Sequence, residues 1–421
     1  MRKSARGEVI KEIYETLRKM REHLERKDPE RSEWVYPAMK YFELAYQNMM
    51  LQKPMLWHFF LLPVEIFRSM DVVAFSPEYA CGVMSTFRGG PVLKYLDVGS
   101  ARVSEELCAV NRFPIGLMFS GDTLTPDMIV YAPAHPCDSA KAAYSNLGYY
   151  FNIPSFYLDL PLLSDERGKE YVVKQYRKMI SFMEEQSKQK LDWDRLREVI
   201  GHANQANEYA HQLNELRKNT PSPVPSRLAV ICGGAIMGLG GTPEIVEWFR
   251  MQCDLAKGRV RNVKGIAREQ KVRLLWIANA VNFDLSILDW LEAKYGAVTV
   301  ASLFHMYPSE PIDNTRDEDT ILQGLATRAL EYPMGRHGRG PVDLYINECI
   351  NVARDYKVDA VIFAGNTGCK WNWATAQLVK DTIYDKLKIP TLTFELVPND
   401  PRVVSYDSIK AKFEQFFELV M

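Results

Sequence analysis

Two similar stretches of the chain each end on a cysteine. They are DMIVYAPAHPC, from Asp127 to Cys137, and DAVIFAGNTGC, from Asp359 to Cys369. Each begins with an acid, continues as an apolar run typical of a buried strand, and passes through a loop of small residues to the thiol. A thiol at such a place can act as a nucleophile, as a metal ligand or as a small apolar filler.

The elements around these thiols predict a parallel α/β fold. After each cysteine come a helical pattern, an Ile-Pro pair and a second strand that carries an acid, Asp159 in one unit and Glu395 in the other. Continuous hydrophobicity indicates strands buried on both faces, so the two units resemble one repeated Rossmann-like unit. Ligands bind beyond the carboxyl ends of parallel strands, where helix N-termini favour anions. Asp138 is expected to cap the first of these helices.

The chemistry around the thiols favours a shared metal centre. A nucleophile needs a base, and His135 is the only local candidate in the first stretch, while the second has none. Cys108, on or beside a predicted helix in SEELCAVNR, is the candidate third ligand. Three cysteines on an iron-sulfur cluster leave one iron open. A zinc site of the three cysteines and His135 is an alternative, although zinc sites usually contain local cysteine pairs.

The length of 421 residues predicts two or three domains. We expect an α/β protein with two Rossmann-like parallel-sheet domains facing a shared cleft. An N-terminal helical segment (1–50) precedes the first such domain (51–165), and a helical connector with the Pro- and Ser-rich linker NTPSPVPSR (166–224) leads to the second (225–421). In the second domain, the apolar runs RLAVIC, RLLWIA, AVTVASLF and DAVIFAG are predicted strands.

Composition excludes several classes of function. With 52 basic and 53 acidic residues, nothing indicates electrostatic capture of nucleic acid or of an anionic membrane. The charged N-terminus, without a signal-peptide pattern, predicts a cytoplasmic protein with reduced thiols. The most apolar stretch, KPMLWHFFLLPVEIFRSM, is too short and interrupted to span a bilayer. The remaining cysteines are assigned to packing: Cys81, Cys232, Cys253 and Cys349.

Two further motifs are weak. CGGAIMGLGG is glycine-rich but lacks the lysine of a phosphate loop and the dinucleotide spacing, so we expect a tight packing turn. GRHGRG places Arg336, His337 and Arg339 on an expected solvated loop, with binding of CoA phosphates as the alternative. Glu65, in LPVEI, is assigned a structural role.

Several motifs occur in an order shared with a known family. LCAVNR, PDMIVYAPAHPCDSA and DAVIFAGNTGCK followed by NDPR resemble three successive ligand motifs, and WHFFLLPVE with SPEYA is similar to a substrate-side segment. The family comprises the iron-sulfur subunits of (R)-2-hydroxyacyl-CoA dehydratases and the related ATP-dependent benzoyl-CoA reductases. The resemblance covers nearly the whole chain.

The resemblance implies a [4Fe-4S] cluster held by Cys108, Cys137 and Cys369 between two Rossmann-like domains. It also implies a homologous second subunit, an activator ATPase as the donor of a low-potential electron, and an acyl-CoA substrate. In the dehydratases that electron permits loss of water from a 2-hydroxyacyl-CoA, and in the reductases it enters an aromatic ring. Glu78, in SPEYA, matches the position of a proposed acid/base near the substrate. A glutamate that merely caps the following helix is the alternative.

The chain departs from the family pattern at two positions. Phe60 stands where the dehydratase active-site subunit usually has serine, and Val110 where an aromatic residue is usual. The expected function is therefore that of a dehydratase subunit, with a benzoyl-CoA-type reductase as a serious rival. A subunit that only relays electrons to its partner is a non-catalytic alternative. A simple two-lobed binding protein would leave the three cysteines unexplained.

Overall fold

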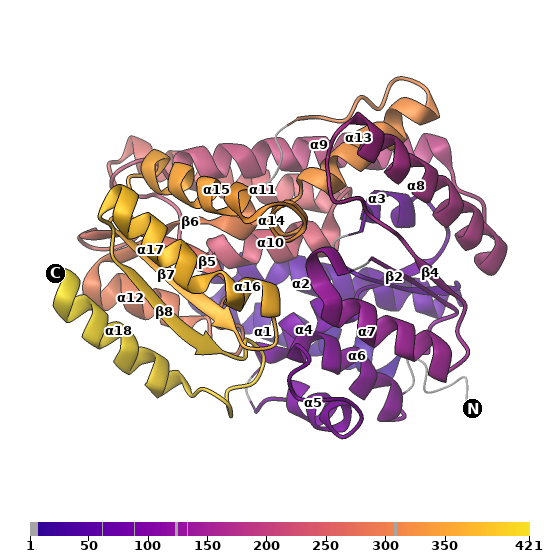
Figure 1. The fold of residues 1–421 in the computed structure, drawn as a ribbon, viewed down its shortest axis with the longest axis horizontal. Helices are drawn as coiled ribbons and strands as arrows, with labels where there is room; N and C mark the ends of the chain where they lie inside the picture. Colours follow the sequence, from indigo (N-terminus) through magenta and orange to yellow (C-terminus); the bar gives the residue numbers. More distant parts are fainter. Residues whose placement is uncertain (1–6, 61, 88, 123–124, 133, 307–309) are drawn as a thin grey trace.

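The computed structural model describes residues 7–421 except 61, 88, 123–124, 133 and 307–309, and it describes only the backbone of 134–136 and 305. The chain forms two parallel four-stranded sheets surrounded by helices (Figure 1). The predicted α/β class with two parallel sheets is therefore confirmed. Within the described residues, no helix is long and apolar enough to cross a membrane.

The first sheet lies in the N-terminal half of the chain. Its strands are all parallel and have the order β2-β1-β3-β4. They are β1 (Met55–His58), β2 (Val73–Phe75), β3 (Met128–Tyr131) and β4 (Ser155–Tyr157). Leu56 of β1 lies opposite Met128 of β3, and every residue of these two central strands is buried. That burial explains their continuous apolar sequence.

The second sheet repeats this topology. Its parallel strands have the order β6-β5-β7-β8, so that β7 occupies the place of β3 and β8 that of β4. They are β5 (Val272–Ala278), β6 (Ala297–Ser302), β7 (Ala360–Asn366) and β8 (Thr391–Leu396). The two units that were expected to be repeats thus hold equivalent places in the two sheets.

Helices cover both faces of the second sheet (Figure 1). On one face α12 (Ser286–Tyr295) and α18 (Tyr406–Val420) pack against the strands. On the other face the core includes residues of α15 (Val342–Asp355) and α17 (Ala376–Leu387). Two separate apolar cores result, one on each side of the strands.

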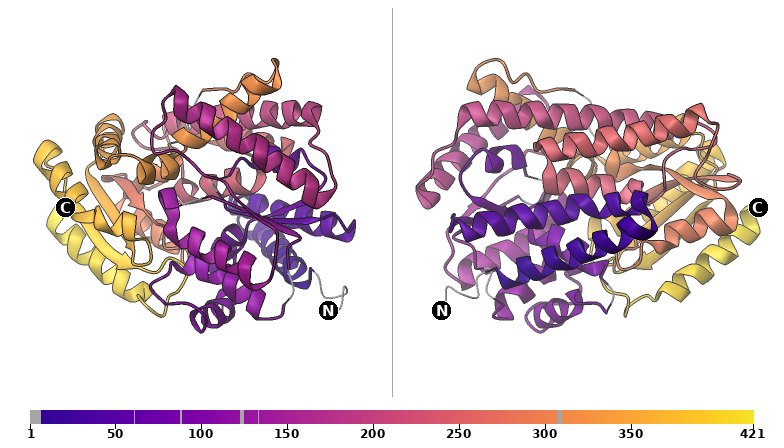
Figure 2. Two further views of the ribbon diagram at one scale, coloured as in Figure 1. Left: turned by 45° about the vertical axis from the view of Figure 1, so that its right-hand side comes forward. Right: turned by 180° about the vertical axis from the view of Figure 1, so that it is seen from behind.

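The N-terminal segment is helical, as expected, and forms an antiparallel helix pair. It consists of α1 (Glu8–Lys27) and α2 (Pro29–Met50), which lie side by side in front of the first sheet when the molecule is seen from behind (Figure 2). Asp28 separates them and caps α2 by accepting a hydrogen bond from Arg31 N–H at 3.2 Å. The helices that accompany the first sheet are α3 (Val64–Arg68), α4 (Pro77–Ser85), α5 (Val92–Ser100), α6 (Ala109–Phe119) and α7 (Ala134–Tyr150).

Long helices connect the two sheets. The polar segment predicted to be helical forms α8 (Glu166–Ser187) and α9 (Trp193–Leu216), and α9 packs along α11 (Pro243–Arg261). The remaining elements are the 3-10 turn η2 (Leu303–His305), α13 (Glu318–Glu331), α14 (Pro333–Arg339) and α16 (Lys370–Ala374).

Three local predictions were wrong. The apolar run RLAVIC is not a strand but the start of α10 (Leu228–Leu239), which also contains most of the glycine-rich motif that we expected to be a turn. The segment GRHGRG is not a solvated loop, because it forms most of α14, where His337 is fully buried and Arg339 is 5% exposed. Short apolar runs do not distinguish a buried helix from a strand, and charged side chains can be buried when partners are at hand.

The Pro- and Ser-rich linker is packed rather than free. Ser222 is fully buried and its N–H donates to Gln270 Oε1 at 2.6 Å. Arg273, at the start of β5, donates to the backbone oxygens of Arg217 and Asn219 at 3.1 and 3.0 Å, and to that of Tyr356 at 2.8 Å. The segment between α9 and α10 is therefore fixed to the edge of the second sheet.

Candidate functional site

Cys137 and Cys369 lie at equivalent places beyond strands β3 and β7. Cys369 is the N-cap residue of α16, and its N–H donates to Asn366 O at 2.9 Å. Cys137 lies within the first turn of α7, which already begins at residue 134. The expectation that Asp138 caps this helix is therefore wrong, and its carboxylate instead accepts from Ser139 N–H at 2.8 Å. The side chain of His135 lies outside the described residues.

Cys108 joins these two segments from a third element. It is the N-cap residue of α6, and its N–H donates to Ser139 Oγ, on the helix of Cys137, at 3.4 Å. Gly368 lies directly against its backbone, since a Cβ on this glycine would come within 2.6 Å of Cys108 Cα. The structure thus brings the loop of Cys369 onto the residue that carries the candidate third ligand.

Asparagine side chains donate hydrogen bonds to two of the sulfurs. Asn366 Nδ2 lies 3.2 Å from Cys108 Sγ, and Asn111 Nδ2 lies 3.4 Å from Cys137 Sγ. The backbone N–H of Ala140 also donates to Cys137 Sγ, at 3.4 Å. Such donors stabilise negative charge on sulfur and tune a metal centre bound there. The sequence analysis missed both asparagines, although each lies three residues from a candidate cysteine.

The three thiols influence one another electrostatically. Burial raises the pKa of Cys108, of Cys137 and, to about 12, of Cys369. Negative charge on Cys108 raises the pKa of both other thiols further, and charge on Cys369 raises that of Cys137. Like charges have this effect only at short range, so Cys137 and Cys369 both lie near Cys108.

The residues present fit a cluster better than a single metal ion. No group of three His, Cys, Asp or Glu side chains in the described part of the chain is placed to hold one ion. In an iron-sulfur cluster each thiolate binds a different iron, so the ligands are more widely separated than around zinc. Three cysteines from separate segments, with amide donors to their sulfurs, suit the cluster, and the residues that would hold it are Cys108, Cys137 and Cys369.

Glu78 lies beside α7, the helix that carries Cys137. It is 5% exposed, and its Oε2 accepts a hydrogen bond from Ser76 Oγ at 3.1 Å. Burial raises the pKa of Glu78 to about 7, and the nearby hydroxyl of Tyr144 opposes this rise. Charge on Glu78 and charge on Cys137 both raise the pKa of Tyr144, so this tyrosine lies near both groups. Among the described residues, Glu78 Oε1 and the Tyr144 hydroxyl have no hydrogen-bond partner of normal geometry.

The other cysteines are placed in the apolar cores. Cys81, Cys232, Cys253 and Cys349 are all buried. Cys253 Sγ lies 3.2 Å from Tyr209 O and donates to it. Cys81 is one helical turn beyond Glu78, and burial, followed by charge on Cys108, raises its pKa well above the usual value. These positions agree with their assignment to packing.

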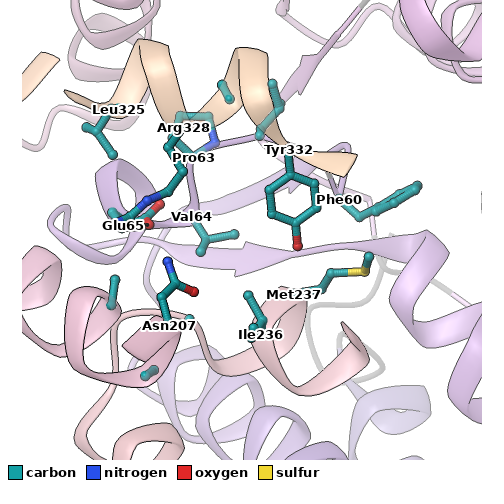
Figure 3. Close-up of a pocket in the computed structure, with 15 residues that line it drawn as sticks. Phe60, Pro63, Val64, Glu65, Asn207, Ile236, Met237, Leu325, Arg328 and Tyr332 are labelled. Carbon is teal, nitrogen blue, oxygen red and sulfur yellow. Dashed lines mark hydrogen bonds and ion pairs between the residues drawn. The ribbon is translucent and has the colours of Figure 1, made fainter. Parts of the chain in front are cut away.

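A cavity of about 60 Å³ opens beyond the carboxyl end of β1 (Figure 3). Phe60 and Met237 lie at one end of it, Glu65 and Arg328 lie at the other, and Tyr332 lies between them. Phe59 N–H donates to Val130 O of β3 at 3.1 Å. Phe60 therefore leaves the sheet beside the end of the strand that leads to Cys137.

Glu65 and Arg328 form a buried ion pair in the wall of this cavity. Arg328 Nη1 lies 3.0 Å from Glu65 Oε1, and the two side chains are 10% and 9% exposed. Arg328 also donates to Asn204 Oδ1 at 2.6 Å. Glu65 thus joins α3 to α13 across the cavity, which agrees with the structural role assigned to it.

Comparison with known proteins places this site in a family. The family model described as 2-hydroxyglutaryl-CoA dehydratase, D-component, matches residues 60–420. The chain belongs to this family. The match includes Glu78 and all three candidate cysteines, and it confirms the family resemblance seen in the sequence.

Two enzyme subunits are similar to this member of the 2-hydroxyglutaryl-CoA dehydratase D-component family. A benzoyl-CoA reductase subunit of Thauera aromatica is 24% identical over 347 residues, which cover 77% of this chain and 79% of that protein. The alpha subunit of lactoyl-CoA dehydratase of Anaerotignum propionicum is 21% identical over 408 residues, which cover 86% and 90%. One relative is a reductase subunit and the other a dehydratase subunit, and both are parts of larger enzymes.

Proposed function

We propose that the protein is the iron-sulfur subunit of an (R)-2-hydroxyacyl-CoA dehydratase and binds a [4Fe-4S] cluster through Cys108, Cys137 and Cys369. The observation that carries this proposal is the pair of asparagine contacts that join the three cysteine segments: Asn366, three residues before Cys369, donates to Cys108 Sγ, and Asn111, three residues after Cys108, donates to Cys137 Sγ. Membership of a family whose named relatives act on CoA thioesters supports it.

The cluster would supply one electron at low potential and Lewis acidity at the iron that no cysteine binds. The chain's own residues would exclude water and manage protons. Glu78 is suited to hold or release a proton near neutral pH, because burial raises its pKa to about 7. Its unpartnered Oε1, within the described part of the protein, is the atom that would exchange that proton. Asn366 and Asn111 would hold the thiolates in place.

A benzoyl-CoA-type reductase is the second candidate. The higher identity to the reductase subunit, 24% against 21%, favours it, and Phe60 departs from the usual dehydratase pattern. A subunit that only relays electrons is the third, and the apolar cavity beyond the carboxyl end of β1 weighs against it. Under each candidate we propose a homologous second subunit, an activator ATPase as electron donor, and an acyl-CoA substrate.

Anaerobic purification with iron and sulfide analysis tests the cluster. We expect about four irons per chain in the wild type and most of them to be lost in Cys369→Ser. Cys253→Ser is the matched control, because this buried thiol lies in an apolar core, and this variant should keep its iron. A colourless, iron-free wild-type protein from an anaerobic preparation would overturn the proposal.

Spectroscopic titration separates the two enzymatic candidates. The reduced enzyme is mixed with a 2-hydroxyacyl-CoA or with benzoyl-CoA, and the electron paramagnetic resonance spectrum of the cluster is recorded. A response to the 2-hydroxyacyl thioester alone supports the dehydratase, and a response to benzoyl-CoA alone supports the reductase. A spectrum that neither thioester changes would favour the relay.

A further inference from the structure

We infer that the cavity between Phe60 and the Glu65–Arg328 pair binds the acyl group of the thioester, and that it accepts a short, uncharged aliphatic group. The inference rests on the proposed function and names the substrate class of the same site. The cavity lies at the carboxyl edge of the first sheet, and Cys137 follows β3 at the same edge. Ligands of open parallel sheets bind along this edge.

The size of the cavity favours an aliphatic group over a ring. Its volume is about 60 Å³, whereas an engineered cavity that binds benzene measures about 150 Å³. About 10–15 Å³ of such volume holds one water molecule, so the cavity has room for a small group of heavy atoms. A short alkyl chain fits this space, and a phenyl ring requires the walls to move.

The walls favour an uncharged group. Ala206, Ile236 and Leu325 are among the apolar lining residues, so most of the contact surface is hydrocarbon. The one cation in the wall, Arg328, is already neutralised by Glu65 at 3.0 Å. A ligand carboxylate would add a second negative charge beside Glu65 in a space with little water, which is unfavourable. An acyl chain that ends in a methyl group carries no charge, so its burial beside Glu65 has no such electrostatic cost.

Phe60 is the residue that limits the depth of the cavity. Its ring lies 4.7 Å from that of Phe59, measured between centroids, which restricts its movement. Met237, at the same end, is flexible and can adapt to small differences in shape (Figure 3). We therefore assign Phe60 the role of a specificity-determining residue for acyl size, and the Glu65–Arg328 pair the same role for acyl charge.

Calorimetric titration of the anaerobically purified protein, with any subunit that purifies with it, tests this assignment. The probes are butyryl-CoA, glutaryl-CoA and benzoyl-CoA, which share the CoA portion and lack the 2-hydroxyl group. We expect butyryl-CoA to bind about tenfold more tightly than either of the others. Equal affinities, or tighter binding of benzoyl-CoA or glutaryl-CoA, would overturn the inference.

Two substitutions should each weaken the preference for butyryl-CoA, one in favour of benzoyl-CoA and the other in favour of glutaryl-CoA. Phe60→Ala enlarges the cavity and should strengthen benzoyl-CoA binding about tenfold. Glu65→Gln releases the charge of Arg328 and should strengthen glutaryl-CoA binding by a similar factor. Phe182→Ala and Glu166→Gln are matched controls outside the cavity and should leave all three affinities unchanged. The wild-type affinities decide the matter even if a variant does not fold.

The outcomes separate this inference from the proposed function. Indiscriminate binding by a protein that contains iron overturns the acyl preference alone. The expected preference in a protein without iron preserves the cavity assignment and overturns the cluster. If no thioester binds, both the acyl site and the proposed activity on CoA thioesters fall, whatever the iron content.

Discussion

Glu78 and Tyr144 are buried side by side without a mutual hydrogen bond of normal geometry. Burial of an unpaired polar atom destabilises a fold, so such atoms are uncommon unless a ligand or water completes them. Tyr144 lies near the thiol of Cys137, since charge on this thiol raises the pKa of Tyr144. At the scale of single residues, the structure thus keeps a carboxyl group available at the expense of stability.

The substitution Glu78→Gln tests whether the buried carboxyl group lowers the stability of the fold. Because burial raises the pKa of Glu78 from 4.5 in the unfolded chain to about 7, the fold prefers the protonated form, and this group lowers the stability as the pH rises from 4.5 through 7. The penalty at pH 8 is about 3 kcal/mol. Gln carries no charge, so we expect the variant to be the more stable protein at pH 8 and about equally stable at pH 4.5, by urea unfolding.

The same variant should lose activity. Removal of a proton donor that acts in the reaction lowers the rate by about 10² or more. Glu106→Gln, at an exposed position, is the control and should change neither property. A Glu78→Gln enzyme that turns over thioesters at the wild-type rate would remove this residue from the mechanism.

Single residues of the site were predictable to different degrees. The strand-end pattern identified Cys137 and Cys369 as candidates, and Cys108 required the family resemblance as well. Asn366 was not predicted as a donor to Cys108, because that contact joins residues 258 positions apart in the sequence. The partnership of Glu65 with Arg328 was hidden for the same reason. Sequence patterns report local periodicity, whereas these contacts depend on how distant segments meet.

Strand β1 leads to the cavity and carries a buried histidine. His58 is 2% exposed, and its Nδ1–H donates to Phe59 O at 3.1 Å, which fixes the neutral tautomer. Its ring lies 4.9 Å from that of Phe67, between centroids. Burial lowers the pKa of His58 to about 4. The element that positions Phe60 therefore depends on an uncharged imidazole.

Acid should weaken this strand. The unfolded chain takes up the proton of His58 near pH 6.5 and the folded chain only near pH 4, so its contribution to stability is complete above pH 6.5 and is lost as the pH falls toward 4. We expect the wild type to lose about 2 kcal/mol more than His58→Asn between pH 7.5 and pH 5. Urea unfolding at the two pH values measures this difference.

His23→Asn serves as the control, since His23 is exposed. The His23→Asn variant should lose as much stability as the wild type between pH 7.5 and pH 5. If His58→Asn also loses stability in parallel with the wild type, another group is responsible for the acid sensitivity.

Most elements could be predicted from the sequence, and the failures have a common cause. The strands β3, β5, β6, β7 and β8 follow from their apolar runs, and α1, α8 and α9 follow from helical periodicity. The segment 228–239 was mistaken for a strand because its apolar residues are continuous, while in the structure it is a helix buried between α2, α4 and β6. When every side of a segment is buried, periodicity no longer distinguishes helix from strand.

On the scale of the whole molecule, the two halves share one topology and are firmly joined. Both sheets have the same strand order, and the linker between the halves is fixed to β5 by Arg273. The sequence predicted the repeated unit but suggested a looser linker. Its proline and serine content is typical of exposed connections, whereas Ser222 is fully buried and Arg273 binds the linker backbone.

Arg273→Ala should loosen this junction. The side chain is 6% exposed and donates to several backbone oxygens, which would be left buried without partners. We expect a loss of about 3 kcal/mol in the free energy of unfolding. Arg273→Lys should recover only part of it, because one ammonium group cannot reach all these acceptors.

The exposed Arg250, which pairs with Glu247 and Asp254, provides the control. Arg250→Ala should change the stability by less than about 0.5 kcal/mol. A similar loss in both variants would mean that the linker is not a structural junction.

The close contact between Gly368 and the backbone of Cys108 has a consequence for biosynthesis. During translation Cys108 and Cys137 leave the ribosome more than two hundred residues before Cys369, yet the loop of Cys369 rests directly on the backbone of Cys108. A nascent chain therefore offers an assembly factor only two of the three thiols until the segment of Cys369 has been synthesised. Under the proposed function, metal delivery must wait for that segment, and a chain terminated before Cys369 would fail to retain a cluster.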